Sequence, residues 1–251
     1  MFKATLDSTK MWKQIVDALT TLLTEAHFVA SSDGIALRQM DSSRAAMIDL
    51  MLPASVFQEY MCDRERQICL GVDELAKISK RLGGDDRLEF VIEDADAEKF
   101  QIRTLGQADR IFRLRMLTPP DSVPRRPSTE LDVRAEMYAE GFKQAIRDVG
   151  VFSSHVRISA NNEAIILAGE GDSGEAEVVL KLGDESALFD LKVKNSATSM
   201  YALSYLSEIS RSVSGDTVIL QFSTNKPITL DFNLAEGSRV GFILAPRVQR
   251  R

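Results

Sequence analysis

The residues that most resemble a chemical motif are Gly169–Gly174, which have the spacing G-x-G-x-x-G. In dinucleotide-binding folds this spacing follows a strand and opens a helix, and its glycines let the backbone approach a pyrophosphate. Here the flanking stretches 164–168 and 175–182 both have the apolar, strand-like character of a hairpin. The carboxylates of Glu170 and Asp172 would also repel a pyrophosphate. We therefore predict a glycine-rich hairpin loop. A small-molecule enzyme that uses this loop is the alternative, which nucleotide binding would support.

Side chains suited to metal binding or acid–base catalysis are few. Cys62 and Cys69 are the only cysteines, and His27 and His155 are the only histidines. Their spacing matches no zinc motif, and two cysteines provide no disulfide framework. The acidic turn Glu93–Asp96 could hold a cation, but solvated acids in a hairpin turn are far commoner. We expect no metal, no cofactor and no catalytic residues, and so a protein that is not an enzyme.

The overall composition is that of a globular protein. The 251 residues are 44% apolar and 27% charged, with a formal net charge of −6. No apolar run reaches the roughly 20 residues of a membrane helix, so we expect no membrane partner. The first ten residues lack the apolar core of a signal peptide, which predicts an intracellular protein. A net negative charge argues against nucleic-acid binding, unless the basic side chains are gathered on one surface.

The elements that would position such a surface follow from periodicity. Apolar residues at helical spacing predict amphipathic helices at Thr9–Leu23 and Val72–Leu82, the second ending at Gly83–Gly84. Alternation predicts a strand at Phe2–Leu6, and Asp33–Gly34 predicts a hairpin turn. Further strands are predicted at His27–Ala30, Ile35–Met40, Ala45–Leu52, Gln67–Gly71, Arg87–Ile92, Glu98–Thr104 and Ile111–Leu117.

The sequence contains an internal repeat with a shift near 130 residues. Helix, strand, polar turn and strand recur in the same order in both halves. Three blocks align: Trp12–Leu19 with Phe142–Val149, 27–37 with 157–167, and, with one added residue, 75–85 with 206–216. Many short strands and two amphipathic helices in each half predict an α+β fold, with the helices on one side of antiparallel sheets.

A proline-rich stretch joins the two copies. Four of the seven prolines fall within Leu117–Leu131, where a helix interior or a central strand is excluded because proline fixes φ and lacks a backbone donor. We therefore expect an N-terminal domain at 1–117, an extended interdomain connector at 118–131 and a C-terminal domain at 132–251.

The outward faces of the four helices are richer in basic than in acidic residues. Eight basic residues share these faces with four acidic ones. The basic residues are Lys10, Lys13, Lys77, Lys80, Arg81, Lys143, Arg147 and Arg211. One interpretation is an ordinary solvated helix face. The other is a basic surface that contacts phosphates without reading bases.

Two strands, one in each half, carry opposite charges. Arg113 and Arg115 share one face of the first strand, and Glu175 and Glu177 share one face of the second. If both are edge strands, opposite charges favour their pairing between chains, and a head-to-tail contact of this kind can close a ring. The alternative is a charged edge that resists aggregation. The predicted interface residues are Ile111, Arg113, Leu114, Arg115, Glu175, Glu177, Val178 and Leu180.

Three motifs carry a family resemblance. They are Gln39–Ser43 after the first hairpin, Tyr60–Arg64, and Leu244–Arg247 near the end. With the length, the repeat and the position of the connector, they make the chain similar to sliding clamps of the proliferating cell nuclear antigen (PCNA) type over essentially its full length. The resemblance implies two repeated DNA-clamp domains per chain and a head-to-tail trimeric ring, with sheets outside and helices lining a hole through which duplex DNA passes.

The resemblance also implies the function. Such a clamp is a DNA polymerase processivity factor that acts in DNA replication and repair without catalysis. It holds double-stranded DNA topologically and non-specifically. Its implied partners are DNA polymerase, a clamp loader, a flap nuclease and DNA ligase, which bind through short interacting peptides. The expected location is nucleoid-associated cytoplasm in a prokaryote or the nucleus in a eukaryote. The alternative is one subunit of a heterotrimeric replicative or checkpoint-type clamp.

Clients of this family insert an apolar anchor under the interdomain connector. The matching residues are Met40, Arg44, Met47, Val123, Pro227, Ile243, Ala245, Pro246 and Val248. Methionine suits a pocket that accepts varied partners, although plain core packing would also explain Met40 and Met47. Ile243 and Arg44 stand where many relatives carry tyrosine and histidine. Arg125–Arg126 lies in a connector that is more apolar and acidic in eukaryotic relatives, so we expect client preference to differ here.

Overall fold

The computed structural model describes residues 1–84, 86–106, 108–127, 130–183, 185–212, 215–234 and 237–247. The chain divides into two compact units. The first comprises Met1–Arg126 and Leu234–Val240, and the second comprises Pro127–Asn233 and Gly241–Arg251. The division between Arg126 and Pro127 falls inside the predicted connector.

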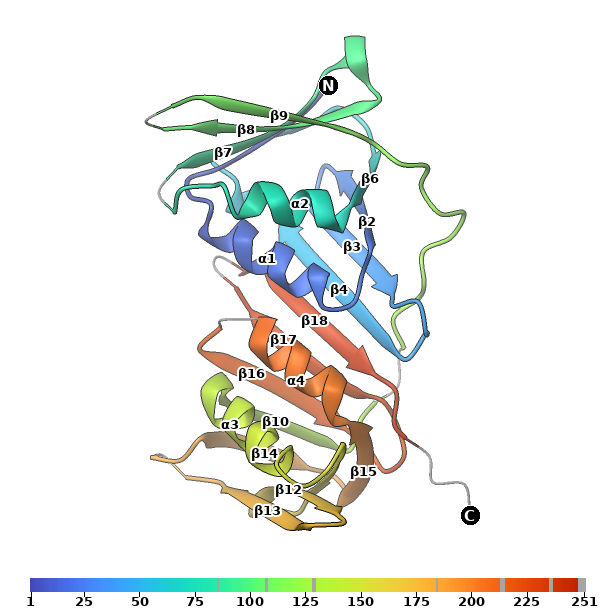
Figure 1. Ribbon diagram of the computed structural model, residues 1–251, viewed down its shortest axis with the longest axis vertical. Helices are drawn as coiled ribbons and strands as arrows, with labels where there is room; N and C mark the ends of the chain where they lie inside the picture. Colours follow the sequence, from blue (N-terminus) through green and yellow to red (C-terminus); the bar gives the residue numbers. More distant parts are fainter. Residues whose placement is uncertain are drawn as a thin grey trace. The chain divides into compact units, whose positions relative to one another are not determined.

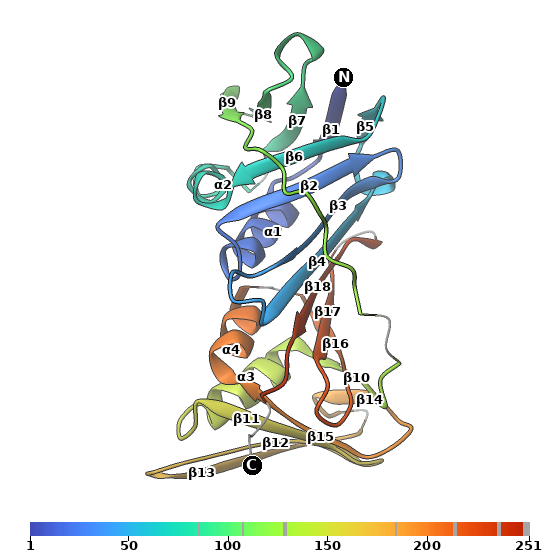
Figure 2. The ribbon, with the colours of Figure 1, turned by 90° about the vertical axis from the view of Figure 1, so that its right-hand side faces the viewer.

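The first unit is built from two helices and two antiparallel sheets (Figure 1). Its elements are β1 (Phe2–Leu6), α1 (Lys10–Thr20), β2 (Glu25–Ser31), β3 (Gly34–Met40), β4 (Ala46–Pro53), β5 (Glu59–Cys62), β6 (Arg66–Gly71), α2 (Val72–Ser79), β7 (Arg87–Ile92), β8 (Lys99–Leu105) and β9 (Arg110–Arg115). The strands are arranged in the orders β5-β1-β7-β8-β9 and β4-β3-β2-β6. Helices α1 and α2 lie side by side on one face of the second of these sheets (Figure 2).

The second unit repeats this arrangement. Its elements are β10 (Val133–Tyr138), α3 (Ala139–Val149), β11 (His155–Ala160), β12 (Ala164–Gly171), β13 (Gly174–Lys181), β14 (Leu188–Val193), β15 (Ala197–Ala202), α4 (Leu203–Ser212), β16 (Thr217–Phe222), β17 (Ile228–Asn233) and β18 (Arg239–Leu244). The first two residues of β18, Arg239 and Val240, group with the first unit. The orders β14-β10-β16-β17-β18 and β13-β12-β11-β15 follow from those of the first unit when nine is added to each strand number. The predicted α+β class and the repeated units are therefore confirmed.

Each unit has a core centred on its first helix. In the first unit, the ring of Trp12 lies 4.6 Å from that of Phe90 and 6.1 Å from that of Phe28. Trp12 is 3% exposed, and Phe142, which the repeat aligns with it, is 1% exposed. Burying a side chain of this size stabilises a fold by about 1.5–3 kcal/mol relative to leaving it in water. The two aligned aromatic residues thus anchor α1 and α3 to their sheets.

Both helices of the first unit end earlier than predicted. Helix α1 ends at Thr20, and not at Leu23, because the chain tightens there: the backbone N–H groups of Thr21 and Leu22 donate to the carbonyls of Ala18 and Leu19 at 3.4 and 3.2 Å. Helix α2 ends at Ser79, and not at Leu82, where the backbone N–H of Leu82 donates to the carbonyl of Ser79 at 3.2 Å. Bonds from residue i to i−3 tighten the final turn in both cases.

Tyr60, the first residue of the Tyr60–Arg64 motif, contacts the turn of the first hairpin. Gly34 has a φ of 138°, and a Cβ placed there would lie 2.0 Å from the carbonyl oxygen of Leu52. The Tyr60 hydroxyl lies 2.7 Å from the carbonyl oxygens of both Ser31 and Gly34. Burial raises the pKa of this phenol, which keeps it protonated as a donor. Tyr60 therefore holds the ends of the hairpin turn together.

The glycine-rich stretch is a hairpin, as predicted. Strand β12 ends at Gly171 and pairs with β13, which begins at Gly174. A Cβ at Gly171 would lie 1.9 Å from the carbonyl oxygen of Phe152. The glycine is needed there for the close approach of two backbone segments, and no helix follows to form a dinucleotide site.

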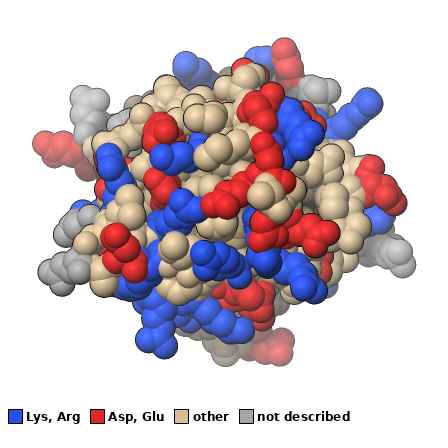
Figure 3. Space-filling view, turned by 90° about the horizontal axis from the view of Figure 1, so that it is seen from above, with Lys and Arg blue, Asp and Glu red and all other residues tan. Residues whose placement is uncertain are grey.

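Charged side chains of both signs mix on the five-stranded sheet of the first unit. The ammonium of Lys3 lies 2.7 Å from Glu59 and 3.2 Å from Glu89, and Arg103 lies 2.6 Å from Glu93. Figure 3 shows such mixing of acidic and basic side chains across one surface view. Opposite charges across neighbouring strands stabilise the sheet by about 0.2–1 kcal/mol per pair.

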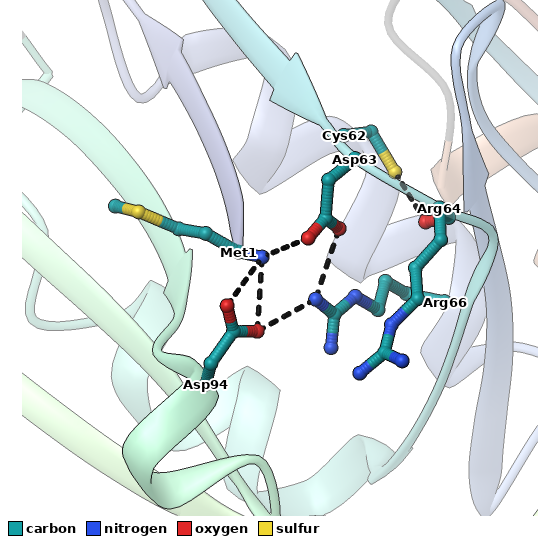
Figure 4. Close-up of polar contacts among 6 residues, drawn as sticks. All are labelled: Met1, Cys62, Asp63, Arg64, Arg66 and Asp94. Carbon is teal, nitrogen blue, oxygen red and sulfur yellow. Dashed lines mark hydrogen bonds and ion pairs between the residues drawn. The ribbon is translucent and has the colours of Figure 1, made fainter.

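The α-amino group of Met1 belongs to a compact cluster at the start of this sheet (Figure 4). It donates to the carboxylates of Asp63 and Asp94, the latter at 2.9 Å. The guanidinium of Arg66 donates to the same two carboxylates at 2.9 and 2.8 Å. Hydrogen bonds from the α-amino group and from Arg66 lower the pKa of Asp63 to about 2 and also lower the pKa of Asp94. Two positive groups thus hold both carboxylates ionised.

Candidate nucleic-acid, subunit and client surfaces

The basic residues of the first unit lie along the adjacent helices α1 and α2. Lys10 begins α1 and is exposed, and Lys77, in α2, has a side chain that is 77% exposed. The ammonium of Lys13 donates to the carbonyl of Leu82 at 2.6 Å, so it links α1 to the turn that follows α2. Lys80 and Arg81 follow α2 and are both exposed. Four of the five predicted residues are therefore open to solvent, and Lys13 is half-buried.

In the second unit, the basic residues are paired with acidic residues of their own helices. Glu140 lies 3.5 Å from Lys143 and 3.4 Å from Arg147 in α3. Arg211 pairs with Glu208 in α4. The Arg147 and Arg211 side chains are 50% and 57% exposed, and that of Lys143 is 25% exposed. All three guanidinium or ammonium groups are partly neutralised by neighbours.

Both groups of residues are suited to weak, sequence-independent contacts. Exposed ion pairs stabilise a protein by about 0–1 kcal/mol, so a phosphate can replace the carboxylate at little cost. Lysine and arginine side chains on a helix surface can each contact a different phosphate as the nucleic acid moves past. The arrangement therefore favours loose electrostatic contact over tight binding at one register.

The predicted interface strands are both at sheet edges. Strand β9 is the last in its five-stranded order, and β13 is the first in its four-stranded order. Along both strands, exposed residues alternate with half-buried ones. Arg113 and Arg115 lie on the exposed face of β9, and Glu175 and Glu177 lie on the exposed face of β13. Unpaired edges of this kind are templates for strand addition.

The predicted client residues of the first unit surround a tight turn between β3 and β4. Met40 and Met47 are register partners across the two strands. Between them, the buried carboxylate of Asp41 accepts hydrogen bonds from the backbone N–H groups of Ala46 at 2.8 Å and Ser43 at 3.3 Å. This turn places Arg44 in the left-handed region at a φ of 59° and exposes its side chain. The Gln39–Ser43 motif thus contains the aspartate whose hydrogen bonds stabilise the turn.

Of the other predicted client residues, Val123 belongs to the first unit and is 46% exposed. In the second unit, Pro227 and Pro246 are half-buried, Ala245 is exposed and Ile243 is 7% exposed. The backbone N–H of Arg247 donates to the carbonyl of Met200 at 2.7 Å, which fixes the end of the Leu244–Arg247 motif against β15. Val248 lies outside the described residues.

Strand β13 also borders a cavity of about 660 Å³ that sequence reasoning did not anticipate. His155, Arg157, Glu175 and Glu177 line it. His155 contacts Arg247, and burial together with that positive charge lowers the pKa of its imidazole. The imidazole is therefore neutral at neutral pH, and the cavity combines acidic and basic walls.

The first described part of the connector crosses the outer face of a sheet of the first unit. Its beginning is fixed where the backbone N–H of Leu117 donates to the carbonyl of Cys69, in β6, at 2.8 Å. Its end is fixed where Arg126 Nη1 lies 3.1 Å from Asp49 Oδ2, in β4. Figure 2 shows the segment between them passing over β6, β2 and β3. Because β6 and β4 stand at opposite ends of the run β4-β3-β2-β6, the connector is a strap fixed on both sides of that run.

Asp49 is a functional candidate that sequence reasoning missed. Its side chain is 5% exposed, and it accepts from Arg38 at 3.0 Å and from Arg239 at 3.4 Å as well as from Arg126. The signal was present in the sequence, because Asp49 is the one charged residue in the apolar stretch Ala46–Pro53. A buried carboxylate in such a strand needs positive partners.

Two kinds of site were not found in the described part of the chain. No group of three or more histidine, cysteine, aspartate or glutamate side chains is placed there to hold a metal ion. No described helix combines the length and the apolar character required to cross a membrane.

Comparisons with known proteins cover almost the whole chain. Residues 1–116 match the family described as proliferating cell nuclear antigen, N-terminal domain, and residues 126–247 match its C-terminal domain. The DNA polymerase sliding clamp of Thermofilum pendens is 31% identical over 251 residues, covering 99% of this chain and 100% of the relative. That of Cenarchaeum symbiosum is 33% identical over 249 residues, covering 98% of each.

A solved structure agrees with the sequence comparisons. The crystal structure of PCNA from Thermococcus kodakaraensis matches with a TM-score of 0.93 at 27% identity, over 98% of this chain and 100% of that chain. The two domain matches fall in the expected order, and the residues between them, 117–125, overlap the predicted connector. The chain therefore belongs to the proliferating cell nuclear antigen family.

Proposed function

We propose that this chain is a DNA polymerase sliding clamp, a ring-shaped processivity factor that encircles duplex DNA and performs no catalysis. The observation that carries the proposal is its likeness, over nearly its full length, to relatives named DNA polymerase sliding clamp. The repeated units support it, since each presents a pair of amphipathic helices with basic outer faces. The domains would be 1–117 and 132–251, joined by the connector 118–131.

The eight basic helix residues would contact the DNA backbone inside the ring. Encirclement, and not affinity, would retain the DNA, so weak and partly neutralised contacts suit sliding. The ring would raise the concentration of a bound enzyme near the primer end, which is an effective-concentration effect. We expect the protein to act inside the cell, at the nucleoid of a prokaryote or in the nucleus of a eukaryote.

The two oppositely charged edges would join chains head to tail into a homotrimer. Arg113 and Arg115 of one chain would face Glu175 and Glu177 of the next. Because a single chain carries both complementary edges, it can close a ring with copies of itself. The solution mass of the purified chain separates a homotrimer from the heterotrimeric alternative.

Client enzymes would bind at the strap through short peptides with an apolar anchor. DNA polymerase, the clamp loader, a flap nuclease and DNA ligase are the proposed clients. In the first unit, Met40 and Met47 are paired on the face of β3 and β4 that also carries Asp49, the residue that binds Arg126 of the strap, and this supports the surface. The residues predicted from the second unit, and Val248, stay a prediction.

The direct test is processive synthesis on primed circular DNA with a cognate polymerase and loader. Adding the clamp should lengthen the products made in one binding event, because the polymerase remains tethered. A linear template with free ends is the control, since a topologically held ring slides off it. Equal product lengths with and without the clamp on circular DNA would contradict the proposed function.

A further inference from the structure

The charged cluster around Asp49 lies next to the paired methionines on one face of β3 and β4. In the register of the two strands, Arg38 faces Asp49, and two residues further along Met40 faces Met47. Side chains two residues apart point to the same face of a strand. These two rows therefore share the face opposite the buried Ile48.

Asp49 orients Arg38 through one edge of the guanidinium. The Nε and Nη2 atoms of Arg38 both lie 3.0 Å from Asp49 Oδ1. Among the described residues, Asp49 is the partner that the structure gives Arg38. The other edge of the guanidinium, formed by Nη1 and the second N–H of Nη2, can therefore bind a ligand. A guanidinium presents its N–H groups in a rigid fork that matches a carboxylate bidentately. The side chain of Arg38 is 35% exposed, so this second edge is within reach of solvent.

The surroundings of Asp49 are strongly basic. Oδ2 accepts from Arg126 in the strap and lies 3.4 Å from Arg239, and these side chains are 27% and 34% exposed. Both arginines make further contacts in the protein. The exposed Arg125 precedes Arg126 in the strap. A negative group that approaches Arg38 would thus meet a favourable potential as well as a preformed fork.

We propose that Arg38, oriented by Asp49, forms a subsite for an aspartate or glutamate side chain of a client peptide, beside the apolar anchor. Arg38 is the specificity-determining residue, and Asp49 is a positioning residue that acts through it. The inference deepens the proposed function and rests on clients docking at the Met40–Met47 surface. A peptide is favoured over nucleic acid because the helices proposed to meet DNA cover the other face of this sheet (Figure 2).

The test uses the full-length protein and three labelled peptides in fluorescence anisotropy. The peptides share one helix-forming anchor of leucine and phenylalanine residues and differ only in the flanking pair, which is Glu-Glu, Gln-Gln or Lys-Lys. At low salt, the wild type should bind the Glu-Glu peptide about threefold to tenfold more tightly than the Gln-Gln peptide, and the difference should shrink at high salt. The Lys-Lys peptide should bind most weakly. Equal affinity for all three would overturn the proposal.

Matched variants separate a built subsite from a diffuse field. Arg38→Gln should remove the preference for glutamate, so that the variant binds the Glu-Glu and Gln-Gln peptides with similar affinity. Arg125→Gln makes the same charge change in the strap, at a residue the structure does not place on Asp49, and should retain most of the preference, because Arg125 contributes only to the surrounding potential. An equal loss in both variants would indicate a diffuse field and overturn the assignment.

For Asp49→Asn, the two explanations predict opposite changes in the binding of the Glu-Glu peptide. A diffuse field predicts tighter binding of the Glu-Glu peptide, because a negative charge has been removed. The positioning role predicts a weaker preference for glutamate, because the Arg38 fork is no longer held. Affinity for the Gln-Gln peptide reports whether the surface remains folded.

The failures of the two proposals are distinguishable. If the Gln-Gln peptide binds and glutamate adds nothing, only the carboxylate subsite is wrong. If no peptide binds, both the subsite and the proposed client surface are contradicted. Competition of short duplex DNA with the Glu-Glu peptide would make the cluster a phosphate site and also overturn the proposal.

Discussion

The two units have the same topology but use their charges differently. In the second unit, Lys143, Arg147 and Arg211 are all close to a glutamate of their own helix. In the first unit, Lys13 is bonded to a backbone carbonyl, and Lys77 lies 3.9 Å from Glu74, the outer limit of an ion pair. The same helix pair thus presents a more strongly positive surface in one copy than in the other.

This difference shows which features a repeated fold constrains. The apolar positions that seat a helix on its sheet are retained in type, as in Trp12 and Phe142, because close packing permits little change of volume. Surface charges are free to diverge, because single exposed pairs contribute little to stability. The same fold can therefore carry two surfaces that differ in positive charge. Variants at equivalent positions of the two units can separate the effects of core packing from those of surface charge.

The largest effect should come from the aligned core aromatics. Trp12→Ala and Phe142→Ala should each lower the free energy of unfolding by about 3–5 kcal/mol, because apolar burial is removed and a cavity is left behind. Trp12→Ala should cost more, because two aromatic rings pack against Trp12. Denaturant unfolding measures both, with Val151→Ala, at a residue 69% exposed, as the control. If the free energies of unfolding of both variants lie within about 0.5 kcal/mol of that of the control, the two aromatic residues do not share an anchoring role.

The second prediction concerns the two edge strands, β9 and β13. These strands do not align with each other in the repeat, and they carry opposite charges. Leu114→Arg in β9 and Val178→Arg in β13 should each convert the proposed trimer to monomers, because both place a charge in the proposed strand pairing. Light scattering measures the mass. Val151→Arg, on an exposed turn, should remain trimeric. A trimer formed by either edge variant would refute the interface assignment for that strand.

Sequence reasoning could predict what depends on local pattern. The helical spacing around Trp12, the Asp33–Gly34 turn and the repeat established the fold class, because each reflects short-range geometry or burial. The position of Asp49 could be suspected, since a lone carboxylate in an apolar strand needs partners. Its partners could not be foreseen, because Arg38, Arg126 and Arg239 are brought together only by tertiary packing.

The third prediction sharpens the contrast between the helix pairs. Lys80→Gln with Arg81→Gln in the first unit should weaken binding to short duplex DNA more than Lys143→Gln with Arg147→Gln in the second. The reason is that Glu140 already neutralises part of the second pair. The slope of log K against log salt should become shallower by about 0.9 for each phosphate that the variant no longer neutralises.

The control for that comparison removes a negative charge, whereas the variants above remove positive charges. Glu140→Gln should strengthen DNA binding, because it releases Lys143 and Arg147 from their common partner. Glu185→Gln, on an exposed loop outside the helices, makes the same charge change and should have a smaller effect. Equal effects of the two variants would show that net charge, and not the local pairing, sets the affinity.

The smallest effect should be the acid sensitivity of the Met1 cluster in the first unit. The pKa of Asp63 is lowered to about 2 by hydrogen bonds from the α-amino group and Arg66. Because the unfolded chain takes up this proton more readily, ionised Asp63 stabilises the fold above about pH 4, and this stabilisation disappears as the pH falls toward about 2. Asp63→Asn should therefore flatten the decrease in melting temperature over that range, whereas Asp172→Asn, in an exposed turn, should leave it unchanged. An unaltered pH profile in Asp63→Asn would mean that the hydrogen bonds of the cluster do not persist in solution, and the first unit would then owe its acid stability to the cross-strand ion pairs of the same sheet.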